Sequence, residues 1–203
     1  GCPRPHCVFI SNVTDVVMED LRVQNSPEWT LHFSSVTGLR VRRITVVNPE
    51  RAPNADGIDV DSCQDVVVED SAFSVGDDAL CVKSGLDYFG RLYNRPTRDV
   101  IFRRIRIGSG HGITVGSETS GGVSNVTFED IDMRGTNVGI RIKSQRGRGG
   151  AVSDVVYRNI TMREIQEECV QVTLNYGQGL APTNSSATPV LQGVLLENVR
   201  CES

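Results

Sequence analysis

The chain has 203 residues and a formal net charge of −4, and 38% of its residues are hydrophobic. This length fits one domain or part of a larger one. The acidic balance excludes a typical nucleic-acid-binding protein, which needs a basic surface, and no apolar run reaches the roughly 20 residues that span a bilayer. The 20 glycines and the low aromatic content of 5% favour tight turns between short strands over a helical bundle.

A two-residue marker, a small or polar residue followed by Val or Leu, recurs at intervals of about 26 residues or more. Its copies are Asn12-Val13, Gly38-Leu39, Asp65-Val66, Asp99-Val100, Asn125-Val126, Asp154-Val155 and Gly193-Val194. A strand follows each marker and a second apolar segment follows that strand, with no sustained helical period between them. The longer intervals contain insertions at 85–96 and 175–189, which are rich in turn-forming residues.

Four units close with a similar stretch whose apolar residues lie two apart. These stretches are Asp56-Gly-Ile-Asp-Val-Asp-Ser, Asp78-Ala-Leu-Cys-Val-Lys-Ser, His111-Gly-Ile-Thr-Val-Gly-Ser and Val138-Gly-Ile-Arg-Ile-Lys-Ser. A period of two indicates a strand with one buried face. About three strands per unit and no helix predict an all-β fold, a parallel β-helix (solenoid) of about seven coils. A leucine-rich repeat has an overlapping period, but its Leu-x-x-Leu-x-Leu frame is absent.

The two ends of the sequence resemble interior coils more than caps. Residues 1–6 contain no amphipathic capping segment, and the chain stops directly after an expected strand. A parallel solenoid needs capping elements over its terminal sheet edges. We therefore expect residues 1–203 to form a single β-helix domain that lacks its terminal coils and caps.

Stacking the four stretches in register places Asp56, Asp78 and His111 in one column, with Asp77 beside them. Neighbouring strands lie about 4.8 Å apart, so these side chains should converge within roughly 10 Å. Three carboxylates at that spacing repel one another, and at least one should keep its proton near neutral pH. A protonated carboxyl group beside an ionised one is what glycoside hydrolysis needs.

A simpler explanation is that Asp and Gly form good turns before strands. This explanation is the better one for Asp65, Asp99 and Asp154. It is weaker for adjacent Asp77 and Asp78, because two carboxylates next to a buried strand are costly without a use.

Two cations, Arg141 and Lys143, lie in the last of the four stretches, one coil after the stretch that His111 begins. Since Ile140 and Ile142 occupy the inward positions, both cations should point outward on the same face. An Arg-x-Lys pair alone is most often a solvated surface, but an arginine beside this cluster could grip a substrate carboxylate through two parallel hydrogen bonds. Cys81 takes the corresponding outward position two coils earlier, so we expect it at the surface.

These motifs resemble, in order and approximate spacing, the four signatures of the polygalacturonase family, glycoside hydrolase family 28. They are Asn54-Ala-Asp56, Gly76-Asp-Asp78, Gly110-His-Gly112 and Arg141-Ile-Lys143. Similar surroundings are Asn25-Ser-Pro-Glu-Trp29 with His32, Val115-Gly-Ser-Glu118 and Gly147-Arg-Gly-Gly150. Ala55 departs from the usual Thr of the first signature and leaves the carboxylate in place.

The resemblance implies a right-handed parallel β-helix that hydrolyses the α-1,4-galacturonan of pectin with inversion, without a metal or cofactor. Asp77 would be the general acid, and Asp56 and Asp78 would position and deprotonate the attacking water. His111 would tune the protonation of the acid. An inverting pair of carboxyl groups would lie roughly 6.5–9.5 Å apart.

The resemblance also implies a set of substrate-binding residues: Asn54, Arg141, Lys143 and Tyr176. Trp29 would be core or cleft wall. Aromatic residues of the insertion at 85–96 could stack on a sugar ring or pack within their own loop, namely Tyr88, Phe89 and Tyr93.

Two alternatives stay open at this point. One is a related hydrolase acting on rhamnogalacturonan or xylogalacturonan, and the other is a non-catalytic carbohydrate-binding β-helix, whose function would survive Asp77→Asn. We expect a polysaccharide as partner, a monomeric protein, and a secreted or periplasmic location on functional grounds. The six cysteines do not reveal their pairing. Asn-x-Ser/Thr sequons, explained equally well by turns or by glycosylation, occur at Asn12, Asn125, Asn159 and Asn184.

Overall fold

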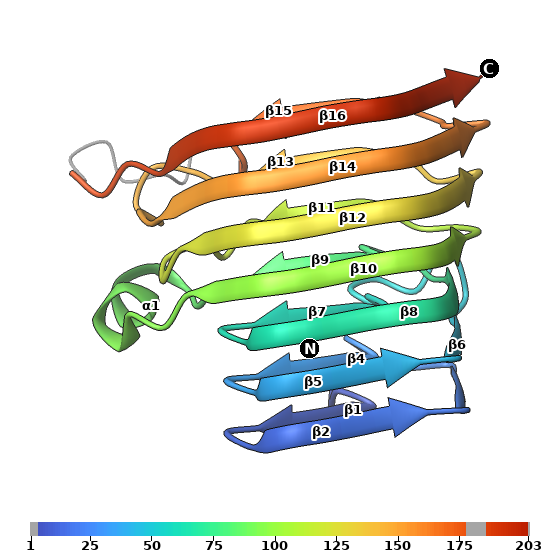
Figure 1. Ribbon diagram of the computed structural model, residues 1–203, viewed down its shortest axis with the longest axis horizontal. Coiled ribbons are helices and arrows are strands. Elements are labelled where there is room, and N and C mark those ends of the chain that lie inside the picture. The colour runs from blue at the N-terminus through green and yellow to red at the C-terminus, as the bar shows by residue number, and fades with distance from the viewer. Residues whose placement is uncertain (1–3, 178–185, 203) are drawn as a thin grey trace.

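The computed structural model describes residues 4–177 and 186–202, which form a stack of coils between two long parallel sheets (Figure 1). One sheet contains the four motif stretches and is called the motif sheet. Its strands, in spatial order, are β1 (Val8–Ser11), β4 (Leu31–Ser34), β7 (Ile58–Asp61), β9 (Leu80–Lys83), β11 (Ile113–Gly116), β13 (Ile140–Lys143) and β15 (Val170–Thr173).

The facing sheet, called the back sheet, follows the same spatial order. Its strands are β2 (Thr14–Glu19), β5 (Thr37–Arg42), β8 (Gln64–Ser74), β10 (Thr97–Ile107), β12 (Val123–Arg134), β14 (Ala151–Arg163) and β16 (Val190–Glu202), with the short β3 (Arg22–Gln24) and β6 (Thr45–Val47) beside them. Each strand pairs in parallel with the strand one coil away. Crossovers between parallel strands are right-handed. The fold is a right-handed parallel β-helix of about seven coils, as predicted.

The motif strands stack in the predicted register. Leu80 pairs with Ile58 on one side and with Ile113 on the other, and Ile113 pairs with Ile140. The residues that precede these strands therefore form a column, which runs across four successive coils.

The first marker was assigned wrongly. Val16, rather than Val13, pairs with Leu39, so the marker of the first coil is Asp15-Val16. Four coils have two left-handed corners three residues apart, at 12 and 15, 35 and 38, 62 and 65, and 122 and 125, and Asn12 (φ 57°) occupies the earlier one of the first coil. Both corners select the same polar residue types, which explains the error.

The corrected markers share one backbone conformation. Their first residues have φ between 52° and 74°: Asp15, Gly38, Asp65, Asp99, Asn125, Asp154 and Gly193. Asp, Asn and Gly adopt this left-handed conformation at the least cost. The recurring marker in the sequence is therefore the corner at which the chain turns into the back sheet.

The expected three strands per coil are present only in the first coils. From β8 onward the strand after the marker and the second apolar segment form one strand of 11 to 13 residues. A single residue with φ between 52° and 55° lies at the join, namely Asp70, Arg104, Asp130, Asn159 or Asn198. The pairing continues through this residue, which is why the structure has fewer and longer strands.

The core between the sheets is a set of ladders of Val, Ile and Leu, with one aromatic stack. Phe102, Phe128 and Tyr157 are fully buried and stack with ring centroids 5.0 and 5.1 Å apart. Each ring comes from the equivalent position of successive back-sheet strands. Apolar burial of this kind is the main stabilising contribution to a repeat fold.

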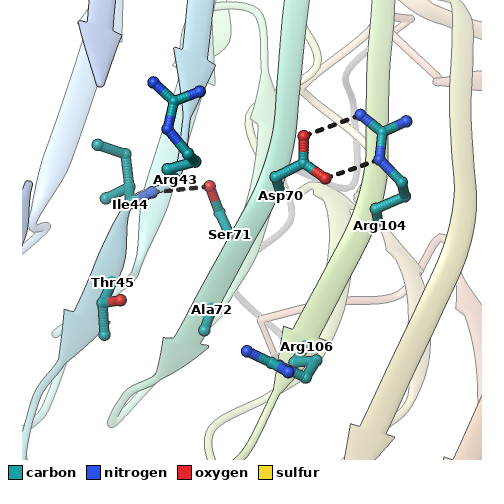
Figure 2. Close-up of a pocket in the computed structure, with 8 residues that line it drawn as sticks. All are labelled: Arg43, Ile44, Thr45, Asp70, Ser71, Ala72, Arg104 and Arg106. Carbon is teal, nitrogen blue, oxygen red and sulfur yellow. Dashed lines mark hydrogen bonds and ion pairs between the residues drawn. The ribbon is translucent and has the colours of Figure 1, made fainter. Parts of the chain in front are cut away.

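The outer face of the back sheet carries paired charges. Arg104 pairs with Asp70 (Figure 2), and Arg43 pairs with Asp20, with closest atoms 2.7 Å apart in each case. These pairs border a hollow of about 420 Å³. The hollow contains none of the predicted site residues, and its acid–base pairs largely neutralise one another.

One short helix is present where the sequence shows no helical period. Helix α1 (Asp87–Tyr93) lies in the insertion between β9 and β10, at one side of the stack (Figure 1). Arg91 of α1 donates a hydrogen bond to the Gly147 carbonyl, and the Tyr93 hydroxyl lies 2.9 Å from Ser35 Oγ. Contacts with neighbouring loops thus hold a helix too short to show a period. Within the described ranges, no helix is long and apolar enough to cross a membrane.

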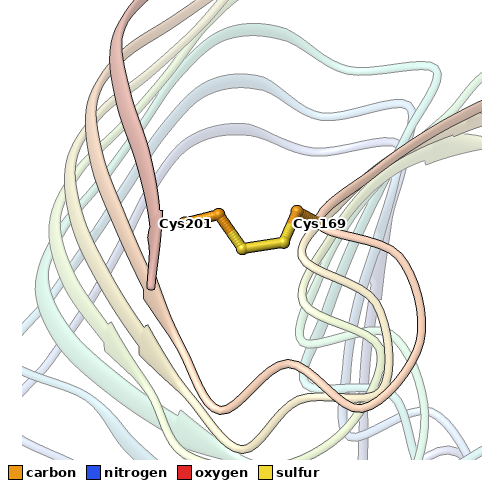
Figure 3. Close-up of a disulfide and its surroundings, with 2 residues drawn as sticks. All are labelled: Cys169 and Cys201. Atoms are coloured by element: carbon orange, nitrogen blue, oxygen red, sulfur yellow. A yellow bond between two sulfur atoms is a disulfide. The ribbon is translucent and has the colours of Figure 1, made fainter. Parts of the chain in front are cut away.

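A disulfide joins the two sheets near the C-terminal end (Figure 3). Cys169, directly before β15, is bonded to Cys201 of β16, with their Cα atoms 6.3 Å apart. In the part of the chain that the structure describes, three cysteines are free: Cys7, Cys63 and Cys81.

Two sequon asparagines use their side chains within the fold. The amide of Asn125 donates to Asp99, and that of Asn159 donates to Asp130. Asn184 lies outside the described residues, as does part of the insertion at 175–189. A role in the turns of the fold is therefore sufficient to explain Asn125 and Asn159.

Candidate active site

A cleft of about 250 Å³ lies against the outward side of the motif sheet. Its lining residues are Trp29, Asn54, Asp56, Asp77, Asp78, Lys83, Ser117, Glu118, Lys143, Arg148 and Tyr176. The two remaining predicted residues, His111 and Arg141, contact the aspartates of this cleft. The structure therefore brings all the predicted site residues together.

Asp77 and His111 form a hydrogen-bonded pair. His111 Nδ1 lies 3.0 Å from Asp77 Oδ1 and 3.8 Å from Asp78 Oδ1. Burial acts to raise the pKa of Asp77, but its hydrogen bond and charge interaction with His111, together with Lys143, leave this pKa below its ordinary value. This hydrogen bond couples the carboxyl group of Asp77 directly to the imidazole ring of His111.

Asp78 is buried at the centre of a charged cluster. Arg141 Nη2 lies 2.5 Å from one of its oxygens, Lys143 Nζ lies 2.8 Å from the other, and Thr114 Oγ1 donates at 2.8 Å. Burial acts to raise the pKa of Asp78, but Lys143 and Arg141 hold it well below its usual range. Asp78 is therefore ionised at any ordinary working pH, and the two cations expected to bind substrate already share it.

Raised pKa values fall on Asp56 and Asp59 rather than on Asp77. Burial, reinforced by the charges of Asp59 and Asp78, raises the pKa of Asp56 well above its ordinary value. Asp59 is fully buried, and burial raises its pKa to about 8 although Lys83 lies 3.7 Å away. The proton that the crowded carboxylates must retain near neutrality is thus held on the Asp56 and Asp59 side of the cleft.

Asp77 and Asp78 approach each other closely. One oxygen of each lies within 4.8 Å of the other. This is nearer than the separation typical of an inverting acid–base pair. The expected spacing of roughly 6.5–9.5 Å is therefore not met by the nearer oxygens of Asp77 and Asp78.

Lys83 was not predicted as a site residue. Its Nζ lies 3.0 Å from Glu118 Oε2 and 4.6 Å from the centre of the Trp29 ring, which it covers. Sequence contained a signal for it, because two of the four motif stretches end in Lys-Ser, and Lys83 and Lys143 occupy the same position two coils apart.

Cys81 is buried, which contradicts the expectation of a surface position. Its Sγ lies 3.2 Å from the Gly116 carbonyl and 3.6 Å from Asp78 Oδ2. Burial raises the pKa of this thiol well above its ordinary value, so it is protonated and unreactive. The outward side of the middle motif strands is the covered floor of the cleft, so an outward residue there is not an exposed one.

Tyr176 lies over one of the cations. Lys143 Nζ is 4.9 Å from the centre of its ring, within the range of a cation–π interaction. Asn54, with φ of 54°, lines the cleft just before Asp56. Both residues therefore line the cleft.

Two groups could each present three ligand atoms to a metal ion: Asp56, Asp78 and Cys81, or Asp77, Asp78 and His111. Both depend on Asp78, whose oxygens already accept hydrogen bonds from Arg141 and Lys143. Two adjacent cations oppose the binding of a metal ion, and the Cys81 thiol is protonated. These donor sets fit a metal poorly.

Asp59→Asn should flatten the dependence of stability on pH. A folded pKa of about 8, against an ordinary value of 3.8, means that the native protein binds more protons than the unfolded chain between these values. Stability then falls as pH rises through this window, by at most about 1.4 kcal/mol per unit. Urea denaturation at about pH 4.5, 6 and 7.5 should show a smaller decline in the variant.

The matched control is Asp65→Asn, which removes an exposed carboxylate paired with Arg40. Its profile should run parallel to that of the original protein. If the Asp59 variant also runs parallel, Asp59 is not the group that titrates in this window.

Comparison with known proteins identifies the family. The family model described as glycosyl hydrolases family 28 matches residues 1–203. A probable polygalacturonase of Vitis vinifera is 36% identical over 98% of this chain and 41% of its own length. An endo-polygalacturonase of Pectobacterium carotovorum subsp. carotovorum is 34% identical over 82% of this chain and 40% of its own length. The chain thus spans about two fifths of these relatives.

Solved structures agree with the fold. A hyperthermoactive exopolygalacturonase from Thermotoga maritima superposes with a TM-score of 0.84 at 29% identity, over 93% of this chain and 42% of that one. A polygalacturonase from Erwinia carotovora ssp. carotovora gives 0.76 at 26% identity, over 98% of this chain and 60% of that one. The ordered motifs, the coil register and the matched family model lead to one conclusion: the chain belongs to glycosyl hydrolases family 28.

Proposed function

We propose that the protein hydrolyses the α-1,4-galacturonosidic bonds of polygalacturonan by general acid and base catalysis, with inversion. One observation carries the proposal: the hydrogen-bonded Asp77–His111 pair meets the Asp78 carboxylate, which two cations hold, in one cleft. The names of the relatives support galacturonan as the substrate.

Asp77 is the proposed acid. Its proton comes from the pair with His111, which stabilises either location of that proton. A sugar that fills the cleft excludes water and favours the neutral form of Asp77. The proton is then available to the glycosidic oxygen as the bond to the sugar carbon breaks.

Asp56 and Asp78 differ in the roles that their charges permit. Asp78 is ionised and can accept a proton from the attacking water, whereas Asp56, with its raised pKa, positions that water. A base held by two cations is weak. A substrate carboxylate that draws Arg141 and Lys143 toward itself would reduce their hold on Asp78 and strengthen it as a base.

Arg141 and Lys143 are the proposed partners of that substrate carboxylate. Each donates one hydrogen bond to Asp78, and both side chains have further N–H donors. The Tyr176 ring over Lys143 and Asn54 beside Asp56 complete the proposed contacts to the sugar. No metal or cofactor takes part in these steps.

Release of reducing ends from de-esterified polygalacturonate at mildly acidic pH tests the proposal. Proton NMR of the first product, before mutarotation, should show the anomer opposite to that of the substrate. Retention of configuration would contradict inversion. Cleavage of rhamnogalacturonan or xylogalacturonan but not of polygalacturonate would select the related hydrolase instead.

We also propose that the protein acts outside the cell or in the periplasm, as a monomer, and that residues 1–203 act as one β-helix unit. The Cys169–Cys201 disulfide supports an oxidising compartment. We expect the protein to run as a monomer on non-reducing gels and to elute as a monomer in gel filtration.

A further inference from the structure

Arg148 lines the same cleft but has no role in the chemistry proposed above. It comes from the turn that follows β13, and its side chain is 13% exposed. It belongs to the stretch Gly147-Arg-Gly-Gly150. A nearly buried guanidinium is stable only when its charge and its N–H groups have partners, and an anionic polymer in the cleft would supply them.

Helix α1 fixes the position of Arg148. Arg148 Nη1 lies 2.6 Å from Asp87 Oδ1 at the start of α1. Arg91, near the end of α1, donates to the carbonyls of Gly147 and Arg148. The insertion that contains α1 therefore holds both the main chain and the side chain of Arg148 in place.

The tether leaves most of the guanidinium donors free. Nε of Arg148 is buried and has no hydrogen-bond partner among the described residues. Asp87 accepts from Nη1, so the edge formed by Nε and Nη2 has no hydrogen-bond acceptor among the described residues. Arg104 uses this same edge to bind Asp70, with distances of 2.7 and 2.9 Å. It is the edge that can take a carboxylate in a bidentate manner.

The charges around Arg148 are consistent with an anionic ligand. Its tether Asp87 is half exposed, with 52% of the side chain accessible, so water weakens that ion pair. Glu118, an acid of the same cleft wall, is already bound to Lys83 at 3.0 Å. A buried N–H without a partner is unfavourable, and a ligand in the cleft would relieve it.

We propose that Arg148 binds the carboxylate of a second galacturonate unit, beside the one held by Arg141 and Lys143. The proposal rests on the proposed function for the identity of the polymer. Arg148 is then a specificity residue for a chain with successive carboxylates, and α1 is the element that positions it.

Binding to the inactive Asp77→Asn form, in which the ligand is not consumed, tests this assignment. Galacturonate and trigalacturonate are titrated into this form with and without Arg148→Gln. We expect the affinity for trigalacturonate to fall about tenfold or more, and the affinity for the monosaccharide to change by less than about twofold, because the single unit needs only Arg141 and Lys143.

Two further variants define the interaction. Arg148→Lys keeps the charge but lacks the fork and should recover only part of the affinity. Asp87→Asn, which weakens the tether but leaves the arginine, should cost a few-fold. Arg98→Gln, on the exposed side of β10, is the matched control and should change neither affinity.

An equal loss for both ligands would show a merely structural role, and no loss for either would remove Arg148 from the site. Either result overturns the inference while the proposed function stands. If the folded Asp77→Asn protein binds no trigalacturonate at all, the proposed function fails first, and the inference falls with it.

Discussion

Asp77→Asn should lower the rate of polygalacturonate hydrolysis by about 10²–10⁴-fold, the contribution expected of a general acid. The amide oxygen of Asn can still accept a hydrogen bond from His111, so the local geometry survives. The amide cannot donate a proton to a leaving oxygen. Asp78 cannot replace it, because Arg141 and Lys143 keep Asp78 ionised. Reducing-sugar release measures the loss.

Two controls separate chemistry from folding in this experiment. Asp65→Asn removes an exposed aspartate that caps the turn into β8 and should leave the rate unchanged. Circular dichroism should be the same for the Asp77 variant and the original protein, and the variant should still bind trigalacturonate. A variant that retains its full rate would show that Asp77 is not the acid, and a protein that binds galacturonan but never cleaves it would be a non-catalytic β-helix.

Arg141→Met should be the most destabilising change in the cleft. It removes one of the two cations that are hydrogen-bonded to the buried carboxylate of Asp78 and leaves Lys143 as the other. Removal of one member of a buried ion pair costs about 3–5 kcal/mol, because the remaining charge has no water to solvate it. Urea denaturation at neutral pH measures this loss, and hydrolysis should fall as well, since the substrate carboxylate also loses a partner.

The matched control is Arg134→Met, which breaks a pair with Glu164 in which both side chains are mostly exposed. Exposed pairs contribute about 0–1 kcal/mol. If the two variants lose equal stability, burial is not what makes the Asp78 cluster important.

The free energy of unfolding measured at acidic pH should also depend on the charged cluster around Asp78. The folded pKa of Asp78 is depressed, so its contribution to stability is complete above the unfolded value near 3.8 and is lost as pH falls toward the folded value. In Arg141→Met this acid-dependent part should be smaller, since less of the depression remains.

Sequence predicts the frame of this protein well because one rule repeats. Apolar residues two apart and left-handed corners recur in each coil, so the stacking of Ile58, Leu80, Ile113 and Ile140 follows from counting alone. The convergence of Asp56, Asp77, Asp78 and His111 follows from that stacking and the strand spacing.

What sequence does not predict is which charges pair and which lose contact with water. Register places Arg141 and Lys143 beside the aspartates, but only side-chain geometry shows that both bind Asp78. Cys81 was misplaced for the same reason, since an outward position says nothing of what covers it. Desolvation likewise depends on the whole cleft wall, so the carboxyl groups with raised pKa values could not be identified by counting.

Helix α1 was missed for a different reason. Seven residues are too few to show a helical period, and contacts to Gly147 and Ser35 from distant coils stabilise it. The sequence of the helix itself does not show these contacts with residues far away in the chain.

The column of site residues limits how this solenoid can change its length. Asp56, Asp78, His111 and Arg141 come from four successive coils, and each depends on its neighbour being one strand away. Duplicating a coil between β9 and β11 would preserve every apolar ladder, yet it would move His111 about 10 Å from Asp78 instead of about 5 Å. The fold would survive and the chemistry would not. Coils can therefore be added or removed without loss of the proposed catalysis only outside the block from β7 to β13.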